Sequence, residues 1–514
     1  MTSAVQADSV PAKATARQWL GLAVIALPCL LYSMDLTVLN LALPRLSVQL
    51  RPSSAQLLWI VDIYGFLVAG FLITMGNLGD RIGRRRLLML GAAGFGIASV
   101  LAAFSNSPTM LIAARALLGV AGATLAPSTL SLIRNMFDDP KQRTMAVGVW
   151  IAAYSAGGAI GPLLGGIMLQ HFWWGSVFLL GVPVMVLLLL VGPHLLPEYR
   201  DRAAAALDFP SVAMSLMAVL AMIYGIKVFA QHGASWLPLS MIAMGGILGA
   251  VFIQRQKHLR DPLIDLKLFR VPAFTVSLIT FTLSAMVMFG SYVFIGQYLQ
   301  LVLGLSPLQA GLWTLPWSAG SIVGSLLIPL IARRLRPAVL MAAGLALAVI
   351  GFALLTQTHA LGLASVVAGS VLYCLGFAPV FTLGTDLIIG AAPPARAGAA
   401  SAISETSFEL GGALGIAILG SIGTAIYRTR MAAARLPGVT AEVRRAAQDT
   451  LGGAAAAADL LPAAQGGTLL QTARDAFEHA MHTTVILCVV ILLATTILAF
   501  VMLRRSSQLA RASD

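Results

Sequence analysis

Long apolar segments recur along the whole chain and are separated by short polar segments. Most apolar segments contain about twenty residues or more, the length at which an α-helix crosses the hydrocarbon core of a bilayer. An all-α polytopic membrane protein is therefore predicted. The pattern places fourteen spans near residues 20–43, 57–78, 87–105, 109–133, 144–169, 174–195, 211–231, 236–253, 273–300, 308–331, 338–357, 362–390, 399–427 and 483–503.

An internal repeat shows how these spans are grouped. GRRRLLMLGAAG at residues 83–94 is similar to RRLRPAVLMAAG at residues 333–344, and each opens a span with a basic turn. Repeats of this kind mark the two halves of a transporter. The first turn lies between the second and third spans and the other between the tenth and eleventh. This spacing predicts two six-helix bundles with two additional helices inserted between them.

The predicted domain boundaries follow from that arrangement. The chain divides into an N-terminal tail at 1–19, an N-terminal six-helix bundle at 20–196, a linker with two additional transmembrane helices at 197–257, a C-terminal six-helix bundle at 258–503 with an external hairpin loop at 428–482, and a tail at 504–514. The patterning of the 428–482 loop predicts two short amphipathic helices outside the bilayer.

Composition and charge support a membrane protein and fix its expected orientation. The chain is 58% hydrophobic and only 10% charged, unlike a soluble globular protein. Its net charge of +13 comes largely from loops on the side of the termini, whereas the opposite loops near 106, 171, 304 and 359 carry no Lys or Arg. The positive-inside rule therefore predicts cytoplasmic termini, and the charge needs no nucleic acid partner.

Enzyme chemistry is not predicted. The sequence has no GxxxxGK[ST] motif, so ATP is not expected to drive the protein directly, and its seven histidines fall in loops or at span ends. The three cysteines lie within apolar runs at spacings that suit neither metal nor disulfide. We expect no catalytic residue, metal or cofactor.

Carboxyl groups inside the predicted spans are the candidate functional residues. A charged group in mid-bilayer costs roughly 2.5–3.5 kcal/mol even on the mildest scale, so each needs a partner or a cavity. Glu405 and Glu409 share one helix face, in the inner half and near the middle of their span. Burial and a like-charged neighbour favour the protonated form, and an arriving lipophilic cation would favour the ionised form. Antiport by competition is one interpretation; a static pair bonded to serines is the other.

Other intramembrane charges leave alternatives open. Asp35, in the outer half of its span, is either a permanent partner of Arg115 or half of a proton switch with it. Asp62 is either a second cation site near the outer mouth or an interfacial residue. Asp386 is expected to be structural, and Lys227 to extend to the membrane surface.

Several motifs resemble those of the major facilitator superfamily. GNLGDRIGRRR at 76–86, Arg115, GGAIGPLLGG at 157–166 and MDLTVLNLALP at 34–44 are similar to signatures of its fourteen-span drug:proton antiporters. VDIYG, FWWGSVFLLGVP and SETSFELGGALG are similar to the QacA/SmvA-type exporters of quaternary ammonium compounds. The resemblance implies a proton-coupled multidrug efflux antiporter of the bacterial cytoplasmic (inner) membrane, acting as a monomer on lipophilic cations such as antiseptics and dyes. It assigns conformational gating to Asp80, Arg81, Gly83, Arg84, Gly161, Pro162 and Gly165.

Aromatic residues near these carboxyl groups are candidates to complete a cation site. Cation–π contacts contribute about 0.5–2 kcal/mol each. The candidates are Tyr64, Tyr154, Tyr292, Trp313 and Phe408, which are otherwise core residues or interface anchors. A proton-coupled transporter of a neutral or anionic metabolite, or of a single antibiotic, is the alternative; it would want a buried Arg or Lys facing the cavity, and only Arg115 qualifies.

Overall fold

The computed structural model describes residues 13–52, 54–200, 208–233, 235–259, 262–434, 436 and 439–512. Fourteen helical segments of this described part are long and apolar enough to cross a membrane, which confirms the predicted number of spans. Prolines in the first turn, preceded by a capping side chain, start several of these helices, because proline fits the first turn, where no intrahelical acceptor is needed. Ser107, Asp139 and Ser306 accept hydrogen bonds from the backbone in this way.

The N-terminal bundle packs around its own apolar core. It consists of α1 (Ala16–Leu50), α2 (Ser54–Ile82), α3 (Arg84–Ala103), α4 (Pro108–Gly122) continued by α5 (Leu125–Met136), α6 (Pro140–His171), and α7 (Ser176–Leu179) continued by α8 (Gly181–Leu195). The helix α1 continues to Leu50, beyond the predicted span end at residue 43.

The C-terminal bundle packs around a second core. Its helices are α11 (Pro272–Gln297) with a short π-helix (Tyr298–Val302), α12 (Pro307–Ile331), α13 (Pro337–Leu355), α15 (Leu363–Ala391), α16 (Ala397–Ala433) and α19 (Ala463–Ala512). The short helix α14 (Thr358–Leu361) joins α13 to α15. Two short helices, α17 (Ala441–Asp449) and α18 (Leu451–Ala458), lie between α16 and α19. The predicted loop bounds of 428 and 482 are too wide, because α16 continues to Ala433 and α19 already begins at Ala463.

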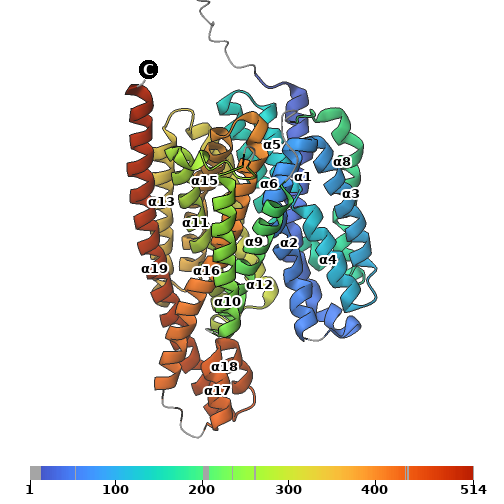
Figure 1. Cartoon of the computed structure of the whole chain (residues 1–514). Helices are drawn as coiled ribbons and strands as arrows, with labels where there is room; N and C mark the ends of the chain where they lie inside the picture. Colours follow the sequence, from blue (N-terminus) through green and yellow to red (C-terminus); the bar gives the residue numbers. More distant parts are fainter. Residues whose placement is uncertain are drawn as a thin grey trace, which may run out of the picture.

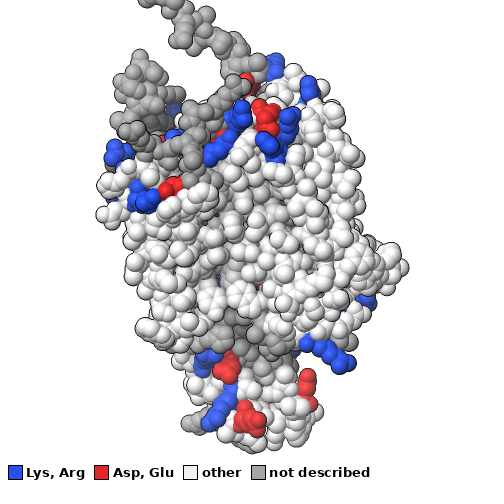
Figure 2. All heavy atoms as spheres, turned by 45° about the vertical axis from the view of Figure 1, so that its right-hand side comes forward, with Lys and Arg blue, Asp and Glu red and all other residues white. Residues whose placement is uncertain are grey.

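The additional helices α9 (Phe209–His232) and α10 (Trp236–Gln256) pack against each other, and α9 also contacts α2 and α16. Figure 1 shows α9 and α10 in the middle of the molecule, with the start of α1 and the end of α19 at one end and α17 and α18 at the other. Figure 2 shows a broad belt almost free of charged side chains between two charged ends, as expected for a surface that faces lipid.

The two bundles meet mainly where α2 packs on α16 and α6 packs on α12, and α5 also contacts α16. Glycines allow the backbones to approach closely at both seams. A Cβ at Gly76 would lie 2.5 Å from the Gly398 carbonyl oxygen, and one at Gly148 would overlap the Ser325 carbonyl oxygen. Any change in which the bundles separate must therefore break close backbone packing.

Candidate functional site

Glu405 and Glu409 lie on α16, where the C-terminal bundle faces the N-terminal bundle. Glu405 is buried, and the Tyr32 hydroxyl of α1 donates a hydrogen bond to Glu409 Oε1 over 3.1 Å. No basic side chain of the described residues lies within ion-pair distance of either carboxyl group. The pair therefore joins the two bundles through a neutral partner, which leaves its charge free to change.

A cluster of aromatic rings centres on Phe408, the residue before Glu409 on α16. Phe408, which lies between them on α16, contacts Phe281 at 5.7 Å, Phe289 at 5.4 Å and Phe381 at 5.6 Å between ring centroids. Across the bundle boundary it contacts Tyr154 of α6 at 6.3 Å. Aromatic faces beside a carboxylate are favourable surroundings for an organic cation.

Two tyrosines extend this aromatic group into the N-terminal bundle. The Tyr32 ring lies 6.0 Å from Tyr154 and 6.2 Å from Tyr64. By contrast, Tyr292 packs on Trp317 at 6.0 Å, and Trp313 lines a cavity of about 540 Å³ along α12. Of the aromatic candidates, Tyr64, Tyr154 and Phe408 are therefore linked to Glu409 by ring contacts that lead through Tyr32, whereas Tyr292 and Trp313 make other contacts.

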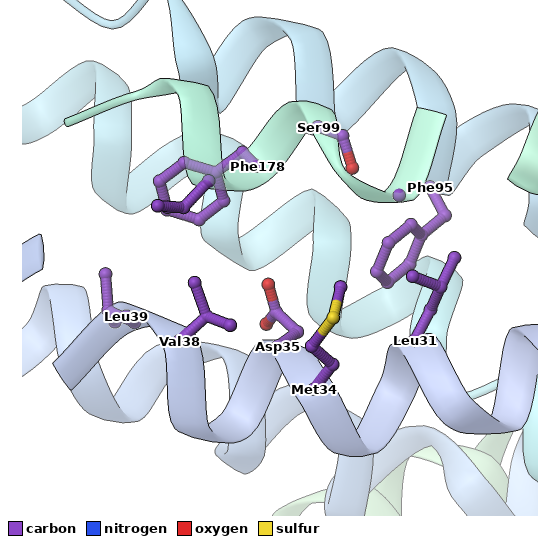
Figure 3. A pocket seen from close by; sticks show the side chains of 10 residues that line it. Leu31, Met34, Asp35, Val38, Leu39, Phe95, Ser99 and Phe178 are labelled. Carbon is purple, nitrogen blue, oxygen red and sulfur yellow. The ribbon is translucent and has the colours of Figure 1, made fainter. Parts of the chain in front are cut away.

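Asp35 and Arg115 form a second intramembrane group. Arg115 Nη1 lies 3.5 Å from Asp35 Oδ2, and the guanidinium lies over the Tyr64 ring at 5.3 Å. Asp35 also lines a cavity of about 20 Å³, enough for one water molecule. Figure 3 shows its carboxyl group pointing away from α1 towards Phe178 and Ser99. The pairing is loose, and a single water has room beside it.

The remaining intramembrane carboxyl groups have firm basic partners. Asp62 Oδ1 lies 2.6 Å from Lys227 Nζ on α9, so Lys227 is paired rather than simply extended to the membrane surface. Asp386 of α15 lies 2.5 Å from Arg143 Nε of α6 and accepts a hydrogen bond from Thr144, so it links the bundles as a structural residue.

The GNLGDRIGRRR turn fastens α2 to α16. Asp80 accepts hydrogen bonds from the Gly398 and Ala399 amides over 3.4 and 3.2 Å, and it pairs with buried Arg84. Arg84 in turn donates to the Gly76 carbonyl oxygen over 2.9 Å. Since Arg396 provides no side-chain cap for α16, the Asp80 carboxylate takes that place from the other bundle.

The other residues expected in gating have varied surroundings. Gly83 adopts a φ of 114°, which favours glycine, and Arg81 is half-buried beside it. Gly161 and Gly165 are buried on α6, while the Pro162 side chain lies outside the described residues. In the same helix a Cβ on Gly157 would overlap the Leu30 carbonyl oxygen, so this part of α6 packs closely on α1.

Sequence reasoning missed three residues of these networks. Tyr32 lies three positions before Asp35 and thus on a neighbouring part of the same helix face, a signal that was available. Arg143 stands near Lys141 in a short basic segment, which indicates the orientation of the spans but no particular partner. Glu198, whose carboxylate accepts hydrogen bonds from the Arg85 and Arg86 amides over 3.2 Å, had no signal before the fold was known.

Two helical bundles with charged groups between them define a membrane transporter, and comparisons identify its family. The model of the Major Facilitator Superfamily matches residues 25–416. The multidrug efflux pump LfrA of Mycolicibacterium smegmatis is 43% identical over 98% of this chain and 100% of that protein. The methyl viologen resistance protein SmvA of Salmonella typhimurium is 38% identical over 90% of this chain and 93% of that protein. This chain belongs to the major facilitator superfamily.

Solved structures agree on the fold. A human organic anion transporter (TETRAN) superposes with a TM-score of 0.58 at 17% identity, covering 93% of this chain and all of that one. A bacterial homologue of the human lysosomal transporter Spinster gives a TM-score of 0.56 at 18% identity, covering 96% of this chain and 99% of that one. These likenesses support the fold, and the family match together with the relatives named as efflux pumps makes the chain a multi-pass membrane transporter.

Proposed function

We propose that this protein exports lipophilic cationic compounds in exchange for protons, as a multidrug efflux antiporter. The observation that carries the proposal is the Glu405 and Glu409 pair, which faces aromatic rings between the bundles with Tyr32 as its hydrogen-bond donor. The relatives named as a multidrug efflux pump and a methyl viologen resistance protein support the same substrate class.

The exchange follows from competition for one charge. A proton on Glu405 or Glu409 neutralises the site, and a lipophilic cation that enters between the rings favours the ionised form, so the proton leaves. After the site turns to the other side of the membrane, an incoming proton displaces the cation. One proton for one monovalent cation moves no net charge, whereas a second proton adds about 2.3 kcal/mol per 100 mV of membrane potential.

Asp35 and Arg115 are proposed to couple protonation to the change in conformation. Protonation of Asp35 would remove the charge that holds Arg115 at 3.5 Å, and the water-sized cavity beside Asp35 gives a proton a place to arrive. Arg115 would then be free to take a new partner. Since Asp35 already occupies this arginine, Arg115 is poorly suited to hold an anionic substrate, which disfavours the anionic alternative.

The contacts of Asp80 and Asp386 are proposed to close the cytoplasmic side. Asp80 lies in the last turn of α2, and Asp386 lies near the end of α15 beside Arg143 at the start of α6. Because successive spans cross the membrane in opposite directions, these helix ends lie on the side where α1 starts. Figure 1 shows the start of α1 and the end of α19 at one end of the molecule, and Figure 2 shows basic side chains there. Cytoplasmic termini in the bacterial inner membrane fit this arrangement. Because one chain holds both bundles and the whole site, we propose that a monomer is sufficient, with the domain boundaries expected from the sequence.

Proton-coupled efflux is tested with purified protein in liposomes loaded with a fluorescent lipophilic cation. Glu405→Gln and Glu409→Gln are expected to reduce transport driven by a pH gradient at least tenfold, because a neutral amide cannot exchange a proton. Glu442→Gln, which neutralises an exposed carboxyl group on α17, is the matched control and is expected to transport normally. Gradient-driven transport that persists in both site variants would overturn the site, and leak without a gradient would overturn antiport.

A further inference from the structure

The helix α9 is one of the two additional helices, and it docks where the two bundles meet. It contacts α2 of the N-terminal bundle and α16 of the C-terminal bundle. Its attachment to α2 has a small apolar core of its own, in which Phe66 and Ala69 pack against Ile223. Leu216 and Leu220 close over Gly70, where a Cβ would lie 2.7 Å from Leu216. Apolar packing thus holds α9 in place without help from charge.

A charged group nevertheless sits within this contact. Lys227 Nζ lies 2.6 Å from Asp62 Oδ1 and 4.7 Å from the centroid of the Phe66 ring. Trp59, Phe66 and Tyr224 form a three-ring cluster with centroid separations of 6.1 to 6.4 Å, and Trp59 stacks on Tyr224 at an interplanar angle of 8°. A carboxylate with aromatic rings beside it is the chemistry by which proteins bind organic ammonium ions.

We propose that Asp62, Trp59, Phe66 and Tyr224 form a peripheral binding site for lipophilic cations, and that Lys227 is its tethered occupant. The Lys227 ammonium stands where the charged centre of such a cation would lie. A cation binds there by displacing Lys227 from Asp62 while the aromatic rings remain. This inference rests on the proposed function, because it names a second site for the same class of substrate.

The exposure of the Lys227 side chain favours an ion pair that opens and closes over a permanent link between α9 and α2. The Lys227 side chain is 33% exposed and Trp59 is 41% exposed, whereas Asp62 is only 16% exposed, so the ammonium lies on the more open side of the pair. The apolar core between α2 and α9 holds the two helices together, so release of Lys227 from Asp62 would leave α9 docked. The Lys227 ammonium competes with a free cation only while Lys227 stays near the Asp62 carboxylate. When Lys227 moves away, the Asp62 site is open to the cation.

Lys227 also connects this site to the central one. It lies on α9, which packs against α16, the helix that carries Glu409. Moving the ammonium away from Asp62 therefore changes the field at the carboxyl group that is proposed to exchange protons. A cation bound at Asp62 would therefore change the electrostatic potential at Glu409 before the cation reaches the central site.

Binding of tetraphenylphosphonium to the purified full chain in lipid nanodiscs tests the site. If the Asp62 carboxylate is free of Lys227 about one tenth of the time, Lys227→Met should tighten binding at this site about tenfold. Lys227→Arg keeps the cation and is the matched control, expected to bind as the parent does. The gain should disappear in Lys227→Met combined with Asp62→Asn. Unchanged affinity in Lys227→Met, or the same gain without Asp62, would overturn the inference.

A second measurement needs no substitution. Acylation of Lys227 by an amine-reactive ester, followed by mass spectrometry, should become at least fivefold faster at saturating tetraphenylphosphonium, because the displaced ammonium is no longer held by Asp62. An unchanged rate would contradict displacement. Since both measurements read binding, failure of the proposed transport would show separately, as absent proton-driven efflux in the parent protein.

Discussion

The Asp80 carboxylate of α2 bonds to two backbone amides at the start of α16, and removing its charge should loosen the bundles at that end. Gly398 and Ala399 lie in the first turn of α16, where backbone amides have no intrahelical acceptor. Their hydrogen bonds to Asp80 therefore belong to the closed arrangement alone. The substitution Asp80→Asn keeps the size of the side chain and one acceptor oxygen while removing the charge.

The size of the effect follows from the bonds that cross the bundle boundary. A hydrogen bond to a charged group contributes about 1.5–3 kcal/mol and a neutral one about 0.5–1.5 kcal/mol. The two bonds are long, at 3.4 and 3.2 Å, so the lower values apply. The charge then accounts for about 1–2 kcal/mol over both bonds, or about five- to thirtyfold in the closed-to-open equilibrium. Asp80→Asn also removes the ion pair with Arg84. Because Asp80 and Arg84 belong to the same bundle, this loss lowers the free energy of unfolding and does not change the closed-to-open equilibrium.

Hydrogen exchange measures this change directly. A peptide covering the start of α16 should exchange the Gly398 and Ala399 amides about five to thirty times faster in Asp80→Asn, in line with the equilibrium shift. Asp139→Asn is the control, because Asp139 caps α6 through the Lys141 amide over 2.9 Å within one bundle. Equal exchange in the parent and Asp80→Asn would refute a role for the Asp80 charge in closure.

Three further predictions concern other parts of the molecule. Asp386→Asn, which breaks the link to Arg143 between the bundles, should also speed exchange at the same end several-fold. Gly157→Val should lower the melting temperature of the purified protein by several degrees, because its side chain would overlap the Leu30 carbonyl oxygen. The pKa of Asp208, outside the spans, is lowered by hydrogen bonds from Arg255 and then Ser211; its contribution is present above the ordinary carboxyl pKa of about 4, and stability should fall as pH drops through that range towards the lowered value.

A control variant or a contradicting outcome separates each predicted effect from a general loss of stability. Gly166→Ala adds a methyl group where nothing lies within 4 Å and should melt like the parent. Asp208→Asn should remove the additional acid sensitivity in thermal melts, so equal acid sensitivity in both proteins would contradict the assignment. Normal exchange at the start of α16 in Asp386→Asn would show that the Asp80 contacts alone keep that end closed.

The lengths of the apolar segments predicted the number of spans, because the thickness of a bilayer sets a minimum length for each helix. The spacing of Glu405 and Glu409 likewise placed both on one helix face. The pairing of Asp62 with Lys227, 165 residues apart, was not predictable. Helices that face lipid on one side and protein on the other are apolar all round, so their sequences carry little information about rotation. Which charges meet is decided by that rotation.

On the proposed mechanism, we expect the strength of each carboxyl group's partner to separate the groups that exchange protons from those that do not. A group that binds and releases a proton in every cycle cannot keep a firm basic partner, because the partner holds it ionised. Asp386 lies 2.5 Å from Arg143 and Asp62 lies 2.6 Å from Lys227, so each of these two groups has a close basic partner. Glu405 and Glu409 have no basic partner within ion-pair distance among the described residues. Asp35, whose carboxylate lies 3.5 Å from Arg115, has a more loosely held basic partner. On the proposed mechanism the central pair therefore carries at most two protons, enough to export a dication without net charge movement and a monocation with help from the membrane potential.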